Sequence, residues 1–517
     1  MAVLIMHDHF PLLSIMIWLP IAAAFIIFAF GRLHTFFART VATIVVLVNM
    51  LLSIILYATF DSLHHGMQWV EMHDWIPAYH IQYALGVDGI SLVMLLLTNF
   101  TGLIVVLAAL RSITHRIEQY MGLFLILQSM ILGVFASLDA ILFYLFWEGM
   151  LIPMYLIIGM WGSHHRIYAA IKFFLFTFFG SIFMLVALIY LYHQTGTFMI
   201  EHFYDVPLTL NAQRLIFIAF LLGFAVKIPM WPIHTWLPDA HTEAPAGGSV
   251  VLAALLLKLG VYGFLRFSLP IVPEGAFHLA NLMIVLSLIA IIYIGLVAIV
   301  QKDMKKLIAY SSIAHMGFAT LGCFLIYGIV AHSHALTDAY MSVEGAIVQM
   351  LSHAFSSGAL FLSVGLLSAR FYNHSRLIKD YGGVAHVMPV FSAFFMLFAM
   401  SNVGLPGTAG FVGEFMVVMS AFQNNFWVAT IAACTLILSA AYTLWMVKRV
   451  FFGPIGNDCV ATFKDVHWID IFNFILLAAT IIFFGIYPQS IIDVIHTSVG
   501  DLLSHSLPHA FFVGSTS

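Results

Sequence analysis

Apolar runs of about twenty residues recur along the whole chain, each long enough to cross a hydrocarbon layer of roughly 30 Å. Hydrophobic residues make up 62% of the 517 and charged residues only 8%, too little polar surface to coat a soluble globule. Backbone polar groups in lipid must be satisfied within their own segment, so the pattern predicts an all-α polytopic membrane protein. We predict about fourteen transmembrane helices, over residues 12–30, 41–60, 87–110, 120–137, 140–161, 169–192, 212–232, 247–267, 277–300, 305–329, 343–369, 386–422, 427–447 and 469–488.

The basic residues divide unevenly over this map. Short cytoplasmic loops collect Lys and Arg, and fifteen of the nineteen lie on one side of the predicted membrane. Arg214 and Arg266 fall in connections on the opposite side, and Lys227 and Lys258 fall inside spans. This distribution places both termini on the non-cytoplasmic side. The segment 68–86, rich in Trp, Tyr and His, is expected outside as an interfacial hairpin.

The sequence contains no motif that indicates a redox centre or a nucleotide-binding site. The three cysteines are scattered, which supplies neither a disulfide framework nor an iron–sulfur site. The glycine-rich patterns GxGxxG and GxxxxGK[ST] do not occur, which argues against nucleotide binding and against an ATP-driven pump. We therefore expect no cofactor and no metal in this chain, no nucleic-acid partner, and an external source of energy.

Several titratable side chains fall inside predicted spans, where a charge costs at least about 2.5 kcal/mol on insertion scales. An ionisable group that persists there usually faces a partner or a hydrated path. Glu148 is roughly 12 Å deep in its span at about 1.5 Å per residue. Lys227 precedes two prolines that break its helix, and Glu414 follows a second break, GLPGTAGFVGEF. The candidates for a proton path are Glu148, Lys227, Lys258, His315, His353 and Glu414.

Plainer roles stay open for some of these residues. Lys227 and Glu414 could simply cap the backbone of broken helices, because freed carbonyls and amides recruit charges. The imidazoles of His315 and His353 could be packed and hydrogen bonded in a core. Two further histidines, His234 and His241, flank a proline-containing turn, where we expect loop hydrogen bonding and not metal ligation.

The spans also suggest an internal repeat. The fourth to eighth spans and the ninth to thirteenth form two five-helix units, each with a titratable group on its second helix and a break in its fourth. Consecutive units with an odd number of spans have opposite orientations, which predicts an inverted repeat typical of secondary transporters. The expected division is an N-terminal three-helix segment (1–117), a first repeat (118–268), a second, inverted repeat (269–453) and a C-terminal helix and tail (454–517).

Two long runs carry a specific resemblance to a known family. They are KIPMWPIHTWLPDAHTEAPAGGSVVLAALLLKLGVYG, residues 227–263, and QKDMKKLIAYSSIAHMG, residues 301–317. Both resemble the proton-translocating antiporter-like family of respiratory complex I, the NADH-quinone oxidoreductase, and the resemblance covers essentially the whole chain. Glu414 at the second broken helix resembles the subunit M (chain 4) branch, because the sister subunits L and N carry lysine there.

The resemblance implies a role for each candidate. Glu148 and Lys227 form the input pair, and Lys258 is the central proton carrier. His315 continues the relay to Glu414, the terminal group towards the outside, and His353 lines the same axis. It further implies that FMN, iron–sulfur clusters and quinone belong to partner subunits. The expected partners are other membrane-arm subunits, especially L and N, and the lipid bilayer; the expected location is the bacterial inner (cytoplasmic) membrane.

Two other functions use the same buried charges. The family also contains subunits of multi-subunit sodium/proton antiporters and of membrane-bound hydrogenases, so a cation/proton exchanger driven by ion gradients is one alternative. A purely structural spacer in the membrane arm is another, and it predicts that Lys258→Ala leaves proton pumping intact.

Overall fold

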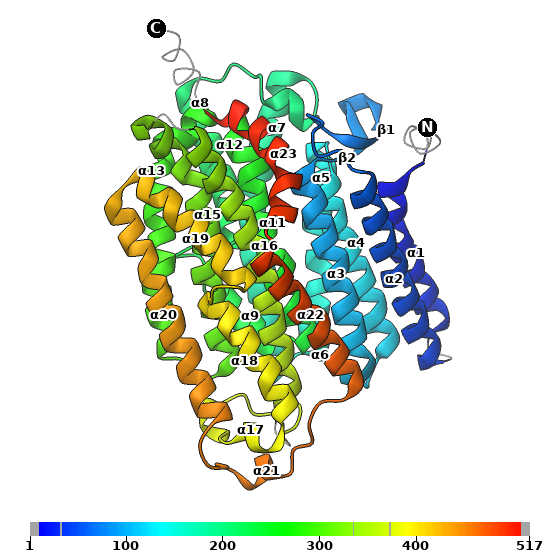
Figure 1. Ribbon diagram of the computed structural model, residues 1–517. Helices are drawn as coiled ribbons and strands as arrows, with labels where there is room; N and C mark the ends of the chain where they lie inside the picture. Colours follow the sequence, from blue (N-terminus) through cyan, green and yellow to red (C-terminus); the bar gives the residue numbers. More distant parts are fainter. Residues whose placement is uncertain (1–9, 32–33, 334–335, 372–373, 508–517) are drawn as a thin grey trace.

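Long apolar helices dominate the fold in the computed structural model, which describes residues 10–31, 34–333, 336–371 and 374–507 (Figure 1). Thirteen helices in these ranges are long and apolar enough to cross a membrane. They coincide with thirteen of the predicted spans to within several residues at either end, so the all-α polytopic class is confirmed. The remaining predicted span, residues 386–422, is formed by two shorter helices, α18 (Pro389–Val403) and α19 (Ala409–Asn424).

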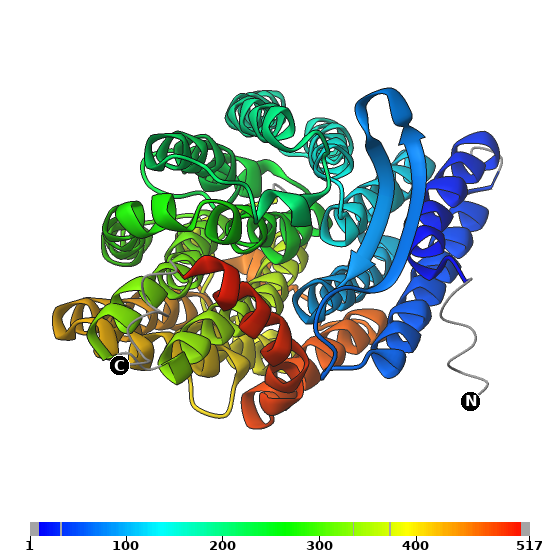
Figure 2. The same ribbon diagram turned by 90° about the horizontal axis from the view of Figure 1, so that it is seen from above.

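The N-terminal part combines three helices with a two-stranded hairpin. Its elements are α1 (Leu12–Phe30), α2 (Thr35–Thr59), β1 (Gln68–Ile76), η1 (Pro77–Tyr79), β2 (Ile81–Val87) and α3 (Gly89–Ser112). The strands pair antiparallel and lie across one end of the bundle, as Figure 2 shows from above. Asp139 ties the hairpin to the helices, because its carboxylate accepts the backbone N–H of Gln82 at 3.1 Å and caps the helix that begins at Ala140. Burial raises the pKa of this carboxyl.

The first five-helix unit contains a helix that stops in mid-membrane. Its elements are α4 (Ile117–Ala136), α5 (Ala140–Gly149), α6 (Leu151–Trp161), α7 (Arg166–Thr195), η2 (Ile200–Phe203), α8 (Leu210–Lys227), α9 (Trp236–Glu243), α10 (Ala246–Val251), η3 (Leu252–Leu256), α11 (Leu257–Gly263), η4 (Phe264–Ser268) and α12 (Leu269–Ile271). The break between α8 and α9 contains Pro229 and Pro232, which have no N–H to continue the helical ladder. Trp236 bridges the break by donating its indole N–H to the carbonyl of Val226 at 2.9 Å.

The second unit has its break at a glycine. Its elements are α13 (Pro273–Ile289), η5 (Ala290–Ile294), α14 (Gly295–Ile299), α15 (Met304–Ser333), α16 (Leu336–Ser368), η6 (Ile378–Asp380), α17 (Val384–Val387), α18, α19 and α20 (Phe426–Phe451). Gly404 ends α18 with a φ of 84°, a left-handed conformation that suits glycine because it has no Cβ. Both units therefore have a discontinuous fourth helix, whereas their inverted relation stays a prediction.

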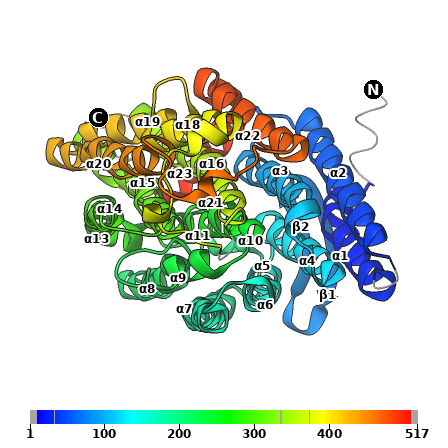
Figure 3. The ribbon, with the colours of Figure 1, turned by 90° about the horizontal axis from the view of Figure 1, so that it is seen from below.

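The central helices of the bundle are much more deeply buried than the peripheral ones. The spans Ala246–Ile271, Met304–His332 and Leu336–Ser368 bury 100%, 94% and 89% of their most apolar stretch, against 39% for α7 and for α20. Figure 3 shows α11, α15 and α16 inside the bundle, with α7 and α20 at its edge. The central helices therefore provide a protein-lined environment in which charged side chains avoid lipid.

The C-terminal part adds a helix that the sequence did not reveal. It contains α21 (Asp458–Ala461), α22 (Trp468–Ile486) and α23 (Gln489–Ser506). α23 occupies part of the segment expected as a tail and crosses the same end of the bundle as the hairpin (Figure 2). Its Ser498 hydroxyl accepts the backbone N–H of Gly89 at 2.8 Å, and its Thr497 hydroxyl donates to the carbonyl of Ser62 at 2.6 Å.

Candidate functional site

Four of the six predicted site residues form one row of contacts through the buried helices. The ammonium Nζ of Lys258 lies 2.7 Å from Nδ1 of His353. The rings of His353 and His315 follow, with 5.9 Å between their centroids. Nδ1 of His315 lies 2.7 Å from Oε1 of Glu414. The row therefore joins the fifth helix of the first unit to the broken helix of the second.

The backbone around Lys258 explains how a lysine is held there. Its side chain is fully buried on α11, which lies between two π-helical segments, η3 and η4. Irregular helical hydrogen bonding of this kind is frequent at functional sites. The ammonium donates to the carbonyl of Ala253 within η3 at 2.6 Å and points towards His353 on α16. The lysine thus has one fixed backbone acceptor and one titratable neighbour.

Glu414 closes the row on α19 with a carboxylate that is 2% exposed. Besides His315, it accepts a long bond of 3.4 Å from the side-chain amide of Gln349. Its second oxygen, and Nε2 of both His315 and His353, are buried without a hydrogen-bond partner in the described ranges. The row therefore retains unused capacity to donate and accept, which a chain of proton transfers requires.

Glu148 and Lys227 lie close in space without a direct bond. Lys227 ends α8, immediately before the break, and its ammonium lies 5.1 Å from the ring centroid of Trp147, beside Glu148 on α5. Glu148 Oε1 and Lys227 Nζ are both buried, and neither has a hydrogen-bond partner among the residues that the structure describes. A cation over an indole face is stabilised by the ring quadrupole, so Trp147 holds the lysine where no carboxylate touches it.

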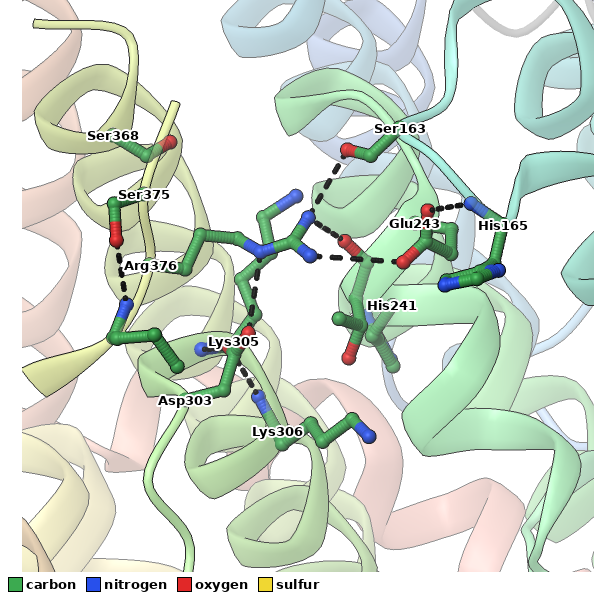
Figure 4. Close-up of polar contacts among 12 residues, drawn as sticks. Ser163, His165, His241, Glu243, Asp303, Lys305, Lys306, Ser368, Ser375 and Arg376 are labelled. Atoms are coloured by element: carbon green, nitrogen blue, oxygen red, sulfur yellow. Dashed lines mark hydrogen bonds and ion pairs between the residues drawn. The ribbon is translucent and has the colours of Figure 1, made fainter. Parts of the chain in front are cut away.

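A polar cluster centred on Arg376 joins side chains from separate segments of the chain (Figure 4). The guanidinium pairs with Asp303 at 3.2 Å and with Glu243 at 3.6 Å, and donates to the hydroxyl of Ser163 at 3.0 Å. Lys305, next to this cluster, donates to the carbonyl of Ala244 at 2.7 Å. A polar cavity of about 660 Å³ opens here, lined among others by His165, Asp239, Glu243, Lys302, Lys306 and Arg376.

The structure departs from the sequence analysis at several polar residues. His241 was expected to hydrogen bond within a loop, but it is fully buried in α9, both ring nitrogens lack a partner among the described residues, and its ring stacks on Phe361 at 4.3 Å. That prediction is wrong because α9 packs against α15 and is not an exposed turn. Lys305 is one of the fifteen cations assigned to one side of the membrane, where an exposed side chain is expected, but it is only 4% exposed. No feature of the sequence pointed to Gln349, whose side-chain amide donates to Glu414.

Metal binding is a separate question from proton transfer. Within the described residues, no group of three or more His, Cys, Asp or Glu side chains has an arrangement that could hold a metal ion. The carboxylate of Glu414 contacts this pair of histidines through a hydrogen bond to Nδ1 of His315. The arrangement suits hydrogen bonding and proton exchange.

Comparison with known proteins gives consistent matches. The model of the NADH:quinone oxidoreductase/Mrp antiporter transmembrane family matches residues 137–439. NADH-quinone oxidoreductase subunit M of Rhodobacter capsulatus is 47% identical over 512 residues, covering 96% of each chain. NADH-ubiquinone oxidoreductase chain 4 of Marchantia polymorpha is 42% identical, covering 95% of this chain and 97% of the relative. A chain in the structure of respiratory complex I from Thermus thermophilus with bound NADH has a TM-score of 0.83 and 29% identity, covering 95% of this chain and 100% of that one.

These matches extend well beyond the runs on which the resemblance rested. The family model alone spans more than half of the chain, and the subunit M relatives extend over nearly all of it. The buried row of titratable side chains lies inside the matched region. The chain therefore belongs to the NADH:quinone oxidoreductase/Mrp antiporter transmembrane family and, within it, to the subunit M group of proton-translocating membrane-arm subunits of respiratory NADH-quinone oxidoreductase.

Proposed function

We propose that the six titratable residues named above form the proton path of this subunit. Glu148 and Lys227 act as the input pair, and Lys258 is the central carrier. His353 and His315 pass the proton to Glu414, from which it leaves. The observation that carries the proposal is the continuity of the row, with 2.7 Å from Lys258 to His353 and 2.7 Å from His315 to Glu414.

The chemistry of the row suits stepwise transfer. A lysine ammonium donates its proton to an imidazole nitrogen within hydrogen-bond reach, and an imidazole releases a proton from one nitrogen while it accepts on the other. Nδ1 of His353 faces Lys258, so Nε2 is left to continue towards His315. Nδ1 of His315 faces Glu414, and the carboxylate accepts the proton. This order gives His353 a direct part in the relay between Lys258 and His315.

The input pair is supported by its geometry as well as by its residue types. Lys227 has no bonded counter-charge among the described residues, so we expect it to respond to the charge on Glu148 through space. Two unit charges about 10 Å apart at an effective dielectric near 20 interact by roughly 1.7 kcal/mol. A movement that brings Glu148 closer to Lys227 therefore changes the charge state that the rest of the row meets.

The wider setting follows from the same assignment. NADH oxidation and quinone reduction take place in partner subunits, which carry the FMN and the iron–sulfur clusters, and this chain holds no redox centre. Its neighbours in the membrane arm are the related subunits L and N. The chain crosses the bacterial inner membrane with both termini on the non-cytoplasmic side, and residues 118–268 and 269–453 act as two inverted half-channels.

The decisive experiment replaces the central carrier in the assembled enzyme. Lys258→Ala in proteoliposomes that contain the complete complex should abolish most NADH-driven proton uptake and slow quinone reduction. Lys258→Arg should also fail, because a guanidinium does not release its proton at neutral pH. NADH oxidation by ferricyanide, which bypasses the membrane arm, is the control for assembly. Normal pumping by an assembled Lys258→Ala enzyme would refute the proposed path.

A further inference from the structure

Arg266 lies at the hairpin end of the bundle in a buried cluster that the proton path does not use. Its place in the sequence predicts an outer connection, but its side chain is only 13% exposed. Its guanidinium pairs with Asp88 at 2.8 Å and donates to the hydroxyls of Ser91 at 3.1 Å and Tyr262 at 3.3 Å. The Tyr262 hydroxyl also lies 2.9 Å from that of Ser91.

The cluster continues the helix face that carries the central lysine. Lys258, Tyr262 and Arg266 follow one another at intervals of four residues on α11 and η4. Residues four apart in a helix lie one above the other, so Arg266 stands roughly 12 Å from Lys258 along the helix axis. The guanidinium stacks over the Tyr262 ring at 5.4 Å. The shortest way from Lys258 to the hairpin end of the bundle therefore passes through this cluster.

The two charged groups of the cluster, Arg266 and Asp88, hold each other as an ion pair. A guanidinium keeps its proton at any physiological pH and repels cations. Tyr204 donates its hydroxyl to the backbone carbonyl of Arg266 at 3.2 Å, and burial raises the pKa of this phenol to about 12. Asp88 is engaged twice, since it pairs with Arg266 and accepts the backbone N–H of Ser91 at 2.8 Å.

Lys258 itself points the other way. Its ammonium turns back by five residues to the carbonyl of Ala253, away from Arg266, and then sideways to His353. Side chains in a helix point back towards its N-terminus, and this orientation keeps the ammonium of Lys258 away from Arg266. The fixed charge of Arg266 thus closes the direct way out and leaves the lateral row through His353 as the route.

We propose that Arg266, held by Asp88, Ser91 and Tyr262, is a seal that prevents protons on Lys258 from crossing directly to the hairpin side. The seal rests on the proposed role of Lys258 as a carrier and adds a function that this role requires. Without the seal, protons pumped by the complex would leak back across the membrane through Lys258. Pore-lining arginines exclude protons from other membrane channels by the same physical effect.

The test measures passive proton leakage, with no NADH present. Proteoliposomes containing the complete complex are given a pH gradient, with valinomycin and potassium to clamp the membrane potential, and entrapped pyranine reports its decay. Arg266→Gln should make the gradient decay several-fold faster than the wild type does. Adding Lys258→Ala to Arg266→Gln should restore the slow decay, because the leak passes through the lysine.

A second variant covers the case in which Arg266→Gln does not assemble. Arg266→Lys keeps the charge and pairs with Asp88, but an ammonium can release its proton, so this variant should leak and should be corrected by Lys258→Ala. Arg214→Gln is the matched control, because Arg214 stands at the same end of the bundle, at the start of α8, and makes none of the Arg266 contacts. It should be as tight as the wild type.

The outcomes separate the seal from the proton path. Tight vesicles with assembled Arg266→Gln or Arg266→Lys would overturn the seal. So would a leak that persists in the double variants, because it would run outside Lys258. The proposed path fails on a different result, unimpaired NADH-driven pumping by Lys258→Ala, which the leak assay does not measure.

Discussion

Glu414→Gln tests the last step of the row with little disturbance to packing. The amide has the shape of the carboxylate and still accepts from Gln349, but it takes no proton from His315. The carboxylate is 2% exposed and its bond to His315 is 2.7 Å long. A hydrogen bond to a charged group contributes about 1.5–3 kcal/mol. If the transfer step loses that stabilisation, the rate of proton delivery through this subunit falls roughly 10- to 150-fold.

The chain offers a matched control for this variant. Glu344 on α16 is also buried, and its Oε1 lies 2.6 Å from Nδ1 of His496, but this pair stands outside the row. Initial rates of NADH-driven acidification, measured with a fluorescent pH probe in proteoliposomes of the whole complex, should therefore drop for Glu414→Gln and not for Glu344→Gln. Equal rates in the two variants, with equal ferricyanide activity, would show that the bond to His315 has no special part in pumping.

Three further predictions follow from the site. Arg376→Ala leaves Glu243 and Asp303 without their cation, and breaking a buried pair costs about 3–5 kcal/mol, so the melting temperature of the purified complex should fall; an unchanged melting temperature would contradict this. His353→Leu removes the titratable side chain that contacts Lys258 and should slow pumping as much as Lys258→Ala does; pumping above half of the wild-type rate would show that His353 is not part of the path. Trp147→Leu removes a cation–π contact of about 1–2 kcal/mol and should impair pumping less than either variant; a complete loss would show a larger role for the indole.

The sequence predicted the spans and most of the site for one physical reason. Lipid imposes a strict cost on polar groups, so a span is visible as an apolar run and a charge within it is visible as an exception. Lys258 and Glu148 stand out in this way without any knowledge of their neighbours. The broken helices were visible too, because Pro229, Pro232 and Pro406 interrupt otherwise helical runs.

The sequence did not reveal residues and helices whose burial depends on packing against distant segments of the chain. Arg266 and Lys305 stand near the ends of spans, where an exposed cation is ordinary, and only the packing of α3 and α9 makes them buried. α23 was hidden because its mixture of polar and apolar residues suits a surface helix and falls below the apolar content of a span. A helical-face argument could have found Arg266, because it follows Lys258 and Tyr262 at a spacing of four.

The spacing of the two histidines bears on how many charges the proposed path can hold at once. Two unit charges 5.9 Å apart, the separation of the His353 and His315 rings, repel by about 2.8 kcal/mol at an effective dielectric near 20. In the proposed path, this repulsion opposes a positive charge on both rings at once, so protons would pass the two histidines one at a time. If Arg266 also closes the direct exit as proposed, a proton loaded on Lys258 leaves only along this row, and its loading is coupled to release from Glu414.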